Sequence, residues 1–430
     1  MRIGIIGSGH VGLVTGACFA DLGNDVICVD SDHKKVEILK KGDCPIYEPE
    51  LHELIKRSVQ QKRLSFTTKI ENAIRNCEVL FICVGTPPRD SGETDLSAVV
   101  QVAKKIAKHM KSYLLIVEKS TVPVETGTLI KKTIQQNLSR KIQFDVASNP
   151  EFLREGSAVR DFFVPDRIVI GVESKRAEEL LRNIYRPFRA PILVTDIKSS
   201  EIIKHASNSF LSTKISFINM IARLCDRVGA DVTKVAEGMG LDPRIMRSFL
   251  NAGIGFGGFC FPKDLAAFVH IAAKLGIDFE LLREVIKINQ TQKDYFVGLC
   301  EKTIGKLKGK KLAVLGLSFK ANTDDMRFAP SIYIIPELQE RGAIISAYDP
   351  VSIPESRTIF KKVQFAKSAY DACEGADAIL VLTEWREFQE IDLGRLRKIV
   401  KSPIIIDGRN IYDPRVVKAA KFKYQGIGRS

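Results

Sequence analysis

Gly7-Ser8-Gly9-His10-Val11-Gly12 stands between a short apolar run, Ile3–Ile6, and a helical pattern over Val11–Leu22. A GxGxxG motif alone is a weak signal. It becomes specific here because the next apolar run, Val26–Val29, ends in the acidic residue Asp30. Gly7 makes the tight turn, Gly9 lets backbone N–H groups approach a pyrophosphate, and Gly12 lets the helix pack closely on the strand. The sequence therefore predicts a dinucleotide site on a Rossmann unit, with Val11 beside the ligand.

The residues around Asp30 indicate which dinucleotide is bound. Its carboxylate accepts hydrogen bonds from ribose hydroxyls and repels a 2′-phosphate, and no arginine follows it directly, so we expect NAD and not NADP. Lys35 either flanks the adenosine end or is a solvated helix lysine, and the sequence favours neither. Thr86 in VGTPP and Thr121 in STVP follow later strands, where loops line the cofactor, although both segments also fit plain turns.

Strand and helix patterns alternate at both ends of the chain, as in parallel sheets with crossover helices. The expected strands are Ile3–Ile6, Val26–Val29, Val79–Val84, Leu114–Glu118, Asp145–Ser148, Arg167–Gly171, Ile192–Val194, Lys311–Leu315, Ile344–Tyr348, Ala378–Leu382 and Pro403–Ile406. Between Ser199 and about Thr303 the pattern is helical only, with one long helix over Glu201–Val228. We expect an α/β protein with two Rossmann-like doubly wound domains, residues 1–198 and 304–430. The long central helix and a helical connector, residues 199–303, join them.

Composition narrows the functional classes. A chain of 430 residues with 45% hydrophobic and 27% charged residues is an ordinary multidomain globular protein, and no apolar run reaches the roughly 20 residues of a membrane span. The apolar start is broken by glycines and lacks a cleavage pattern, so we expect a cytoplasmic protein with no membrane partner. The net charge of +14 favours anionic ligands, but no nucleic-acid-binding signature is present. The nine cysteines include no CxxC pair or zinc spacing, so we expect neither disulfides nor a metal site.

The segment Gly253–Asp264, GIGFGGFCFPKD, contains the strongest candidate for a nucleophile. Four glycines in six residues give the backbone freedom to approach a ligand, and Cys260 then lies just before a helix, near Lys263. A helix N-terminus and a lysine both favour the thiolate, although a cysteine at an arbitrary position is usually a buried structural one. The glycine-rich loop favours a reactive cysteine over a structural one at this position.

Other polar residues lie where a substrate would meet them. Lys204 and Asn208 share one face of the long helix, either as a surface stripe or as a clamp for a developing alkoxide. Glu151 and Glu155 follow the strand Asp145–Ser148, over the edge of the sheet. Residue chemistry alone leaves these alternatives open.

Together, the motifs resemble the UDP-glucose/GDP-mannose dehydrogenase family of nucleotide-sugar 6-dehydrogenases, and especially its UDP-glucose branch. The resemblance spans nearly the whole chain. Its motifs are GSGHVGL, PIYEPEL, VGTP, STVP, NPEFLREG, EIIKHASNSFLSTKISFINM, GIGFGGFCFPKD, GLSFKANTDDMR and DGRN.

The resemblance implies a four-electron oxidation of a UDP-sugar with two NAD per substrate. Lys204 and Asn208 would stabilise the oxyanion, and Cys260 would form a thiohemiacetal and then a thioester. Glu151, Thr121 and Asp264 would handle the hydrolytic water. Residues 1–198 would bind NAD, residues 199–303 would dimerise and carry the catalytic Lys and Cys, and residues 304–430 would bind the UDP-sugar.

The same likeness assigns binding residues. Those facing NAD are Glu155, Lys263 and Arg327. Those facing the UDP-sugar, besides Glu151, Lys204 and Asn208, are Phe152, Leu153, Arg154, Phe249, Asn251, Gly253, Gly257, Lys320 and Arg409. Arg244 would enter the site of a neighbouring subunit, which implies at least a homodimer built on the long helix.

Three residues depart from the family pattern. Phe259 replaces a commonly small residue before the cysteine, His10 stands where tyrosine is frequent, and Met246 replaces a common glycine. These changes affect kinetics and the subunit contact and leave the chemistry intact.

Three alternatives remain open. A 6-dehydrogenase for GDP-mannose shares the PKD element after the cysteine, whereas enzymes for UDP-N-acetylhexosamines typically lack it. A two-electron hydroxy-acid dehydrogenase needs no cysteine. A catalytically inactive NAD-binding protein has no use for Glu151, Lys204, Asn208, Cys260 and Asp264 together.

Overall fold

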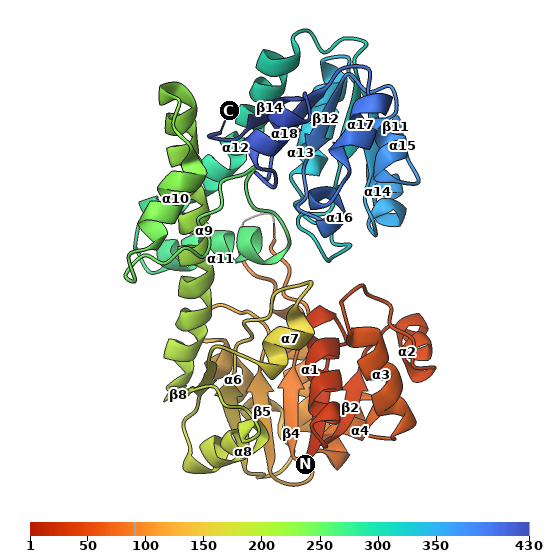
Figure 1. Cartoon of the computed structure of the whole chain (residues 1–430). Helices are drawn as coiled ribbons and strands as arrows, with labels where there is room; N and C mark the ends of the chain where they lie inside the picture. Colours follow the sequence, from red (N-terminus) through yellow and green to blue (C-terminus); the bar gives the residue numbers. More distant parts are fainter. Residues whose placement is uncertain (90–91, 430) are drawn as a thin grey trace. The chain divides into compact units, whose positions relative to one another are not determined.

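The computed structural model describes residues 1–89 and 92–429 and has the expected α/β class, with two sheets and a long helix (Figure 1). Contacts between Cα atoms divide the chain into two compact units. The first is Met1–Ser207 with Ala266–Ile277, and the second is Asn208–Leu265 with the chain from Asp278 to the C-terminus. The division into three functional domains stays a prediction.

The sheet of the first unit has eight strands in the order β3-β2-β1-β4-β5-β6-β7-β8. They are β1 Arg2–Ile6, β2 Asp25–Val29, β3 Leu64–Thr67, β4 Val79–Ile82, β5 Leu114–Glu118, β6 Phe144–Ser148, β7 Ile168–Gly171 and β8 Ile192–Thr195. The sheet is parallel, as expected, except where β7 meets β6 antiparallel, with Ser148 opposite Gly171. The edge strand β3 was not expected.

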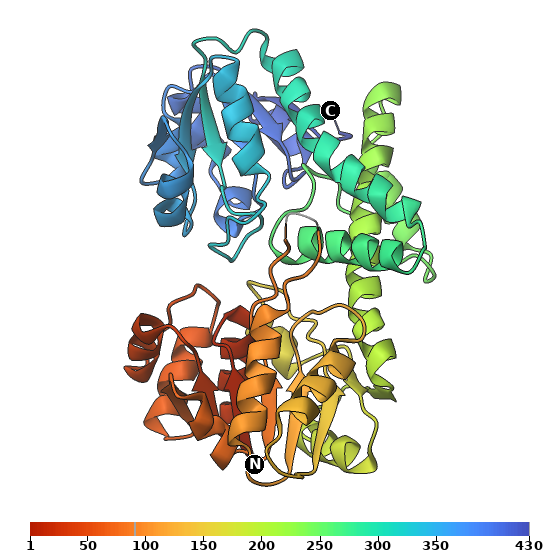
Figure 2. The same cartoon turned by 180° about the vertical axis from the view of Figure 1, so that it is seen from behind.

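Helices cover both faces of this sheet, so its central strands are buried on both sides (Figures 1 and 2). The helices are α1 His10–Asp21, α2 His33–Lys40, α3 Leu51–Gln60, α4 Ile70–Asn76, α5 Ser97–His109, α6 Thr126–Asn137, α7 Ala158–Phe163 and α8 Lys175–Tyr185. Phe81 packs with α1, α3 and α7, whereas its neighbours Leu80 and Ile82 pack with α4, α5 and α6. Alternate residues of a strand point to opposite faces, which explains this division.

The middle of the chain is helical, as expected: α9 Ile197–Val228, α10 Val232–Gly240, α11 Cys260–Lys274 and α12 Glu280–Ile304. The helix α9 has 32 residues and is therefore roughly 48 Å long. Cys260 is the first residue of α11 and not, as expected, the residue before it. In the described part of the chain, no helix is both long and apolar enough to cross a membrane.

The sheet of the second unit is parallel, in the order β11-β10-β9-β12-β13-β14 of a doubly wound Rossmann fold. Its strands are β9 Lys311–Leu315, β10 Ile344–Tyr348, β11 Val363–Phe365, β12 Ala378–Val381, β13 Ile404–Asp407 and β14 Lys423–Gly426. Its helices are α13 Ser331–Glu340, α14 Ile353–Ile359, α15 Ala369–Cys373, α16 Arg386–Gln389, α17 Leu393–Ile399 and α18 Pro414–Ala419. Strands β11 and β14 were not expected.

Each of the two sheets has a turn of the same kind after its first strand. After β1, Ser8 N donates to Asp30 Oδ2 at the end of β2, and after β9, Leu317 N donates to Asp349 Oδ2 at the end of β10. Both turns place a glycine with positive φ after the first strand: Gly7 at 102° and Gly316 at 93°. The sequence similarity between the two ends of the chain therefore reflects a shared structural device.

Candidate active site

The turn after β1 has the shape that a dinucleotide phosphate requires. Gly7 has a φ of 102°, and a Cβ on it would lie 2.6 Å from Cys83 O. A Cβ on Gly12 would lie 1.9 Å from Gly7 O, so only glycine allows this packing of α1 on β1. Space lies open beside Gly9, the N-cap of α1, and a glycine has no side chain that could cap the helix. The backbone N–H groups at this N-terminus therefore fit a pyrophosphate.

Asp30 is held at the end of β2 by contacts on both carboxylate oxygens. Oδ2 accepts from Ser8 N at 2.9 Å and from Lys35 Nζ at 3.2 Å, and Oδ1 accepts from Asp32 N at 3.0 Å. The sequence left the position of Lys35 open, and the structure pairs it with Asp30. The carboxylate thus lies next to the phosphate-binding turn, where an adenosine ribose would reach it.

The loops after β4 and β5 meet each other. Thr86 Oγ1 donates to Thr121 O at 2.9 Å, and Ser120 Oγ donates to Val84 O at 2.8 Å. The two segments that were expected to line the cofactor therefore form one hydrogen-bonded edge beside the phosphate-binding turn.

A buried ion pair joins α9 to the loop after β6. Lys204 Nζ lies 3.0 Å from Glu151 Oε1, with side-chain exposures of 6% and 5%. Glu151 Oε2 accepts from Leu153 N at 2.6 Å, and Lys204 Nζ lies 5.5 Å from the ring centroid of Phe152. These contacts exclude the surface-stripe alternative for Lys204, because a stripe of that kind would be solvated.

Residues on the next turn of α9 and on the first turn of α11 form a second buried polar cluster. Asn208 Nδ2 donates to Asp264 Oδ2 at 2.6 Å, and Lys263 Nζ lies 2.8 Å from Asp264 Oδ1. Cys260, partly exposed, begins α11 and shares a helix face with Lys263 and Asp264. The thiol therefore lies at the positive end of the dipole of α11.

Two residues that were expected to face NAD lie near the ring of Phe259. The Arg327 guanidinium lies 4.4 Å from the centroid of its ring, and Lys263 Nζ lies 5.7 Å from it. Arg327 also pairs with Asp325 at 2.7 Å. The aromatic ring therefore offers a face to both cations.

The other expected substrate residues of the first unit follow Glu151. Phe152 stacks on Arg167 at 3.7 Å, and Arg154 forms a two-point ion pair with Asp161 at 2.9 and 2.6 Å. Together with Leu153 they line one pocket of the first unit. Buried beside this pocket is Lys119, which the sequence reading missed. Its ammonium donates to Asn149 Oδ1 at 3.1 Å, and burial lowers its pKa.

In the second unit, Arg409 fixes the glycine-rich loop. Its guanidinium donates to the carbonyls of Leu382, Gly255 and Phe319 at 2.9, 3.1 and 2.8 Å. Lys320 Nζ lies 5.4 Å from the Phe319 ring centroid. Of the remaining expected substrate residues, Phe249 has a φ of 65°, Asn251 is exposed, and Gly253 and Gly257 are buried. Arg244 is highly exposed and pairs with Asp242.

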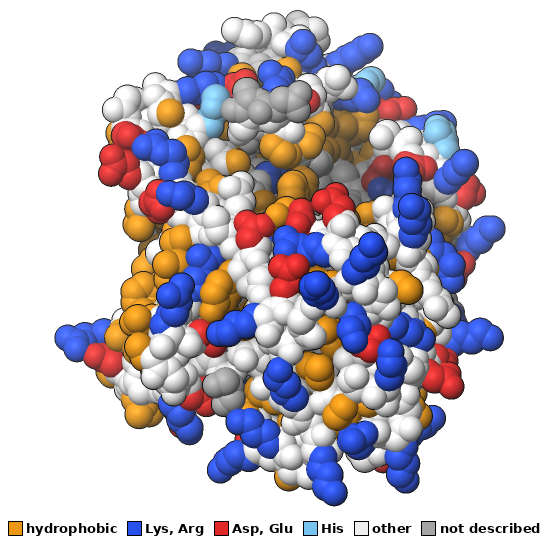
Figure 3. All heavy atoms as spheres, turned by 90° about the horizontal axis from the view of Figure 1, so that it is seen from above, with side chains coloured by type: hydrophobic (Ala, Val, Ile, Leu, Met, Phe, Trp, Pro, Cys, Tyr) orange, Lys and Arg blue, Asp and Glu red, His pale blue; other side chains and the backbone are white. Residues whose placement is uncertain are grey.

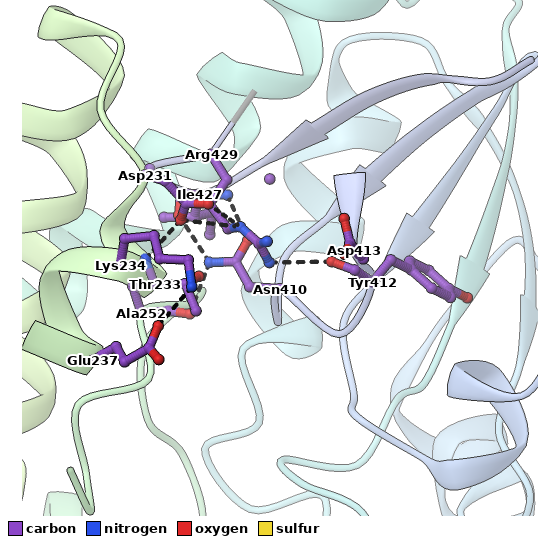
Figure 4. A network of polar contacts seen from close by, with 12 residues as sticks. Asp231, Thr233, Lys234, Glu237, Ala252, Asn410, Tyr412, Asp413, Ile427 and Arg429 are labelled. Carbon is purple, nitrogen blue, oxygen red and sulfur yellow. Dashed lines mark hydrogen bonds and ion pairs between the residues drawn. The ribbon is translucent and has the colours of Figure 1, made fainter. Parts of the chain in front are cut away.

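The sequence reading also missed the polar side chains that hold this loop. Asn410 donates to Ala252 O at 3.3 Å and to Ile427 O at 2.8 Å, and Arg429 Nε lies 3.2 Å from Asp231 Oδ1 (Figure 4). Asn219 Oδ1 accepts from Gly253 N, and Gln292 Nε2 donates to Gly253 O. The sequence signal for these contacts was the presence of amide residues within the helices α9 and α12.

The face drawn in Figure 3 has charges of both signs. Figure 3 shows lysine and arginine side chains spread over the face it draws, among acidic and apolar ones. Among the described residues, no group of three or more His, Cys, Asp or Glu side chains is arranged to hold a metal ion.

Comparison with known families matches three segments of the chain to one family, UDP-glucose/GDP-mannose dehydrogenase. Residues 1–189 match its NAD binding domain, residues 198–291 its central domain, and residues 313–414 its UDP binding domain.

Individual relatives are similar over the full length. The UDP-glucose 6-dehydrogenase TuaD of Bacillus subtilis is 48% identical over 429 residues, 100% of this chain and 93% of the relative. A UDP-glucose dehydrogenase structure from Pyrobaculum islandicum has a TM-score of 0.92 at 37% identity, covering 100% of this chain and 98% of that one. A UDP-D-ManNAc dehydrogenase structure from Pyrococcus horikoshii has a TM-score of 0.87 at 29% identity, covering 100% and 99%.

Proposed function

The chain belongs to the UDP-glucose/GDP-mannose dehydrogenase family, an NAD-dependent oxidoreductase family, and we propose that it oxidises the C6 hydroxyl of UDP-glucose to the carboxylate. Relatives named UDP-glucose 6-dehydrogenase, which are 44–48% identical over the whole chain, support this substrate. The observation that carries the chemistry is the cluster that Asn208 of α9 forms with Lys263 and Asp264, which lie on the helix turn that Cys260 begins.

The first oxidation requires a stabilised alkoxide. NAD, when bound, supplies the hydride acceptor for both oxidations. The ammonium of Lys204 and the amide of Asn208 lie one turn apart on α9 and would hold the negative oxygen at C6. The aldehyde then forms when the C–H bond at C6 breaks.

The second oxidation requires a covalent bond to the protein. The Cys260 thiolate adds to the aldehyde carbon, which forms a C–S bond and an oxyanion of the thiohemiacetal. Loss of the second hydride gives a thioester. This route keeps the carbon attached to the protein at the aldehyde level.

Hydrolysis releases the product. Water attacks the thioester carbon, the C–S bond breaks, and the thiolate of Cys260 is restored. A carboxylate must accept the proton of the water. Glu151, paired with Lys204, and Asp264, paired with Lys263, are both buried carboxylates that could do so. Thr121, in the loop after β5, would position this water.

The binding roles follow the same proposal. Gly7, Gly9, Val11, Gly12, Asp30, Lys35, Thr86, Thr121, Glu155, Lys263 and Arg327 would bind NAD. The UDP-sugar would contact Phe152, Leu153, Arg154, Phe249, Asn251, Gly253, Gly257, Lys320 and Arg409. The cytoplasmic location stays a prediction.

The decisive experiment is an assay with candidate sugars that counts NADH. We expect two NADH per UDP-glucose and little turnover of GDP-mannose or UDP-N-acetylhexosamines. Cys260→Ser leaves no sulfur to form the thioester and should stall the reaction after the first oxidation, whereas a two-electron hydroxy-acid dehydrogenase would keep its activity. No turnover of UDP-glucose would rule out this substrate.

The surface of α9 supports a homodimer. Phe210, Phe217 and Leu224 follow at seven-residue spacing and expose 66%, 48% and 58% of their surface. A row of large apolar residues at this spacing is typical of a helix that packs against another. Light scattering should give the mass of a dimer, and Phe217→Glu should give a monomer. A wild-type monomer at assay concentration would contradict the dimer and the proposed role of Arg244.

A further inference from the structure

Glu48 is a buried carboxylate outside the residues discussed above, and it contacts two loops of the NAD-binding unit. It lies in the segment Pro45–Leu51, before α3, and its side chain is fully buried. Oε1 accepts from Ala158 N at 2.8 Å, at the start of α7, and Oε2 accepts from Gly156 N at 2.7 Å. The same Oε2 lies 2.8 Å from His10 Nε2.

His10 lies inside the phosphate-binding turn, as the first residue of α1. The helices α1 and α7 pack side by side, which brings the turn and the loop before α7 together (Figure 1). Because Glu48 contacts both, it connects the cofactor-binding turn with the loop that contains Glu151 and Glu155.

The surroundings of His10 favour its protonated form. Burial lowers the pKa of His10, but the contact with Glu48 and the charges of Glu155, Glu48 and Glu151 raise it above the ordinary value. Each of these groups belongs to a segment that packs against α1: the segment before α3 or the loop before α7. His10 therefore keeps its proton to a higher pH than an ordinary histidine does.

A proton on His10 changes the charge of the turn by one unit. With His10 neutral, the carboxylate of Glu48 has no cationic partner at this contact, and the turn is more negative. An anionic pyrophosphate at the N-terminus of α1 is then repelled more strongly.

We propose that His10 and Glu48 are cofactor-positioning residues whose ion pair makes NAD affinity depend on pH, with tighter binding when His10 is protonated. The dissociation constant for NAD should rise roughly threefold to tenfold between pH 6 and pH 9, the size of one unscreened charge near a phosphate. This inference depends on NAD binding and not on the thiolate chemistry. The two can therefore fail separately.

The test is calorimetric titration of the full-length protein with NAD between pH 6 and pH 9. Wild-type protein should show the rise in dissociation constant, and His10→Gln should lose it. His52→Gln is the matched control, because His52 is an exposed histidine of the same unit that pairs with Asp43. It should keep the wild-type pH dependence.

A second probe separates charge from shape. ADP-ribose keeps the pyrophosphate and should follow the same pH dependence as NAD, whereas uncharged adenosine should not. Glu48→Gln should also remove the dependence, and a circular dichroism spectrum checks that this variant folds.

The inference is overturned if His10→Gln keeps the wild-type pH dependence, if the wild-type dissociation constant is constant, or if adenosine shows the same rise. Absence of NAD binding at every pH would instead contradict the proposed function.

Discussion

Asn208 Nδ2 donates a hydrogen bond of 2.6 Å to Asp264 Oδ2, which joins α9 to the helix turn that begins with Cys260. The contact orients the amide, and the ammonium of Lys263 holds the other carboxylate oxygen at 2.8 Å. Both carboxylate oxygens of Asp264 are therefore held in place, which is the preorganisation that the proposed proton transfer would require.

Replacing Asp264 by Asn should remove a proton acceptor and leave the shape of the cluster nearly unchanged. We expect kcat to fall about 100-fold to 1000-fold with little change in the KM for UDP-glucose. Steady-state NADH production measures both. Asp278→Asn, which removes an exposed carboxylate paired with Arg283, is the control and should keep the wild-type kcat. An unchanged kcat in Asp264→Asn would remove Asp264 from the chemistry.

Replacing Lys204 by Met should leave Glu151 buried without its cation. We expect the free energy of unfolding to fall by about 3–5 kcal/mol, and Lys204→Met with Glu151→Gln should recover much of it without restoring activity. Urea denaturation followed by circular dichroism measures the change. The control Lys131→Met breaks an exposed pair with Glu173 and should lower it by less than about 1 kcal/mol. Equal losses in the two single variants would contradict the burial argument.

Glu201 should make stability depend on pH. Its carboxylate accepts from Glu125 N and Gly127 N at 2.7 and 2.8 Å, but burial, the largest influence, raises its pKa to about 7. A raised carboxyl pKa contributes stability that is fully present below the ordinary value of 4.5 and is lost as pH rises through about 7.

From pH 4.5 to pH 8, the free energy of unfolding of wild type should therefore fall by on the order of 3 kcal/mol relative to that of Glu201→Gln. Melting curves at pH 4.5, 6 and 8 measure it. Exposed Glu179, changed to Gln, is the control and should follow the wild type. A constant difference across this range would show that burial does not govern Glu201.

Phe259 should influence cofactor binding through the cations stacked on its ring. Phe259→Leu removes the surface beneath Arg327 and Lys263, so the KM for NAD should rise about threefold while the KM for UDP-glucose changes little. Steady-state kinetics with each substrate varied measures the two constants. Phe365→Leu, which removes a ring stacked on Arg357, should change neither. A rise in both constants would point to loss of loop structure instead.

Local patterns predicted much of this molecule. The apolar runs before Gly7 and Gly316 became β1 and β9, and the helical spacing over Glu201–Val228 lies within α9. The strands β3, β11 and β14 were missed because they are short and lie near or at sheet edges, where half-exposed residues weaken the pattern. Periodicity also contains no information about direction, so the antiparallel contact of β7 with β6 was not predictable.

Residue types and spacing were enough to specify the class of fold, the phosphate-binding turn and the candidate thiol, because turns, helix starts and strand ends depend on neighbours in the chain. Folding alone brought Glu48 to His10, Asn410 to Ala252 and Arg409 to Gly255. These partners are far apart in sequence, and no local pattern records them. They meet because each buried polar group must find a partner wherever the packed elements leave one.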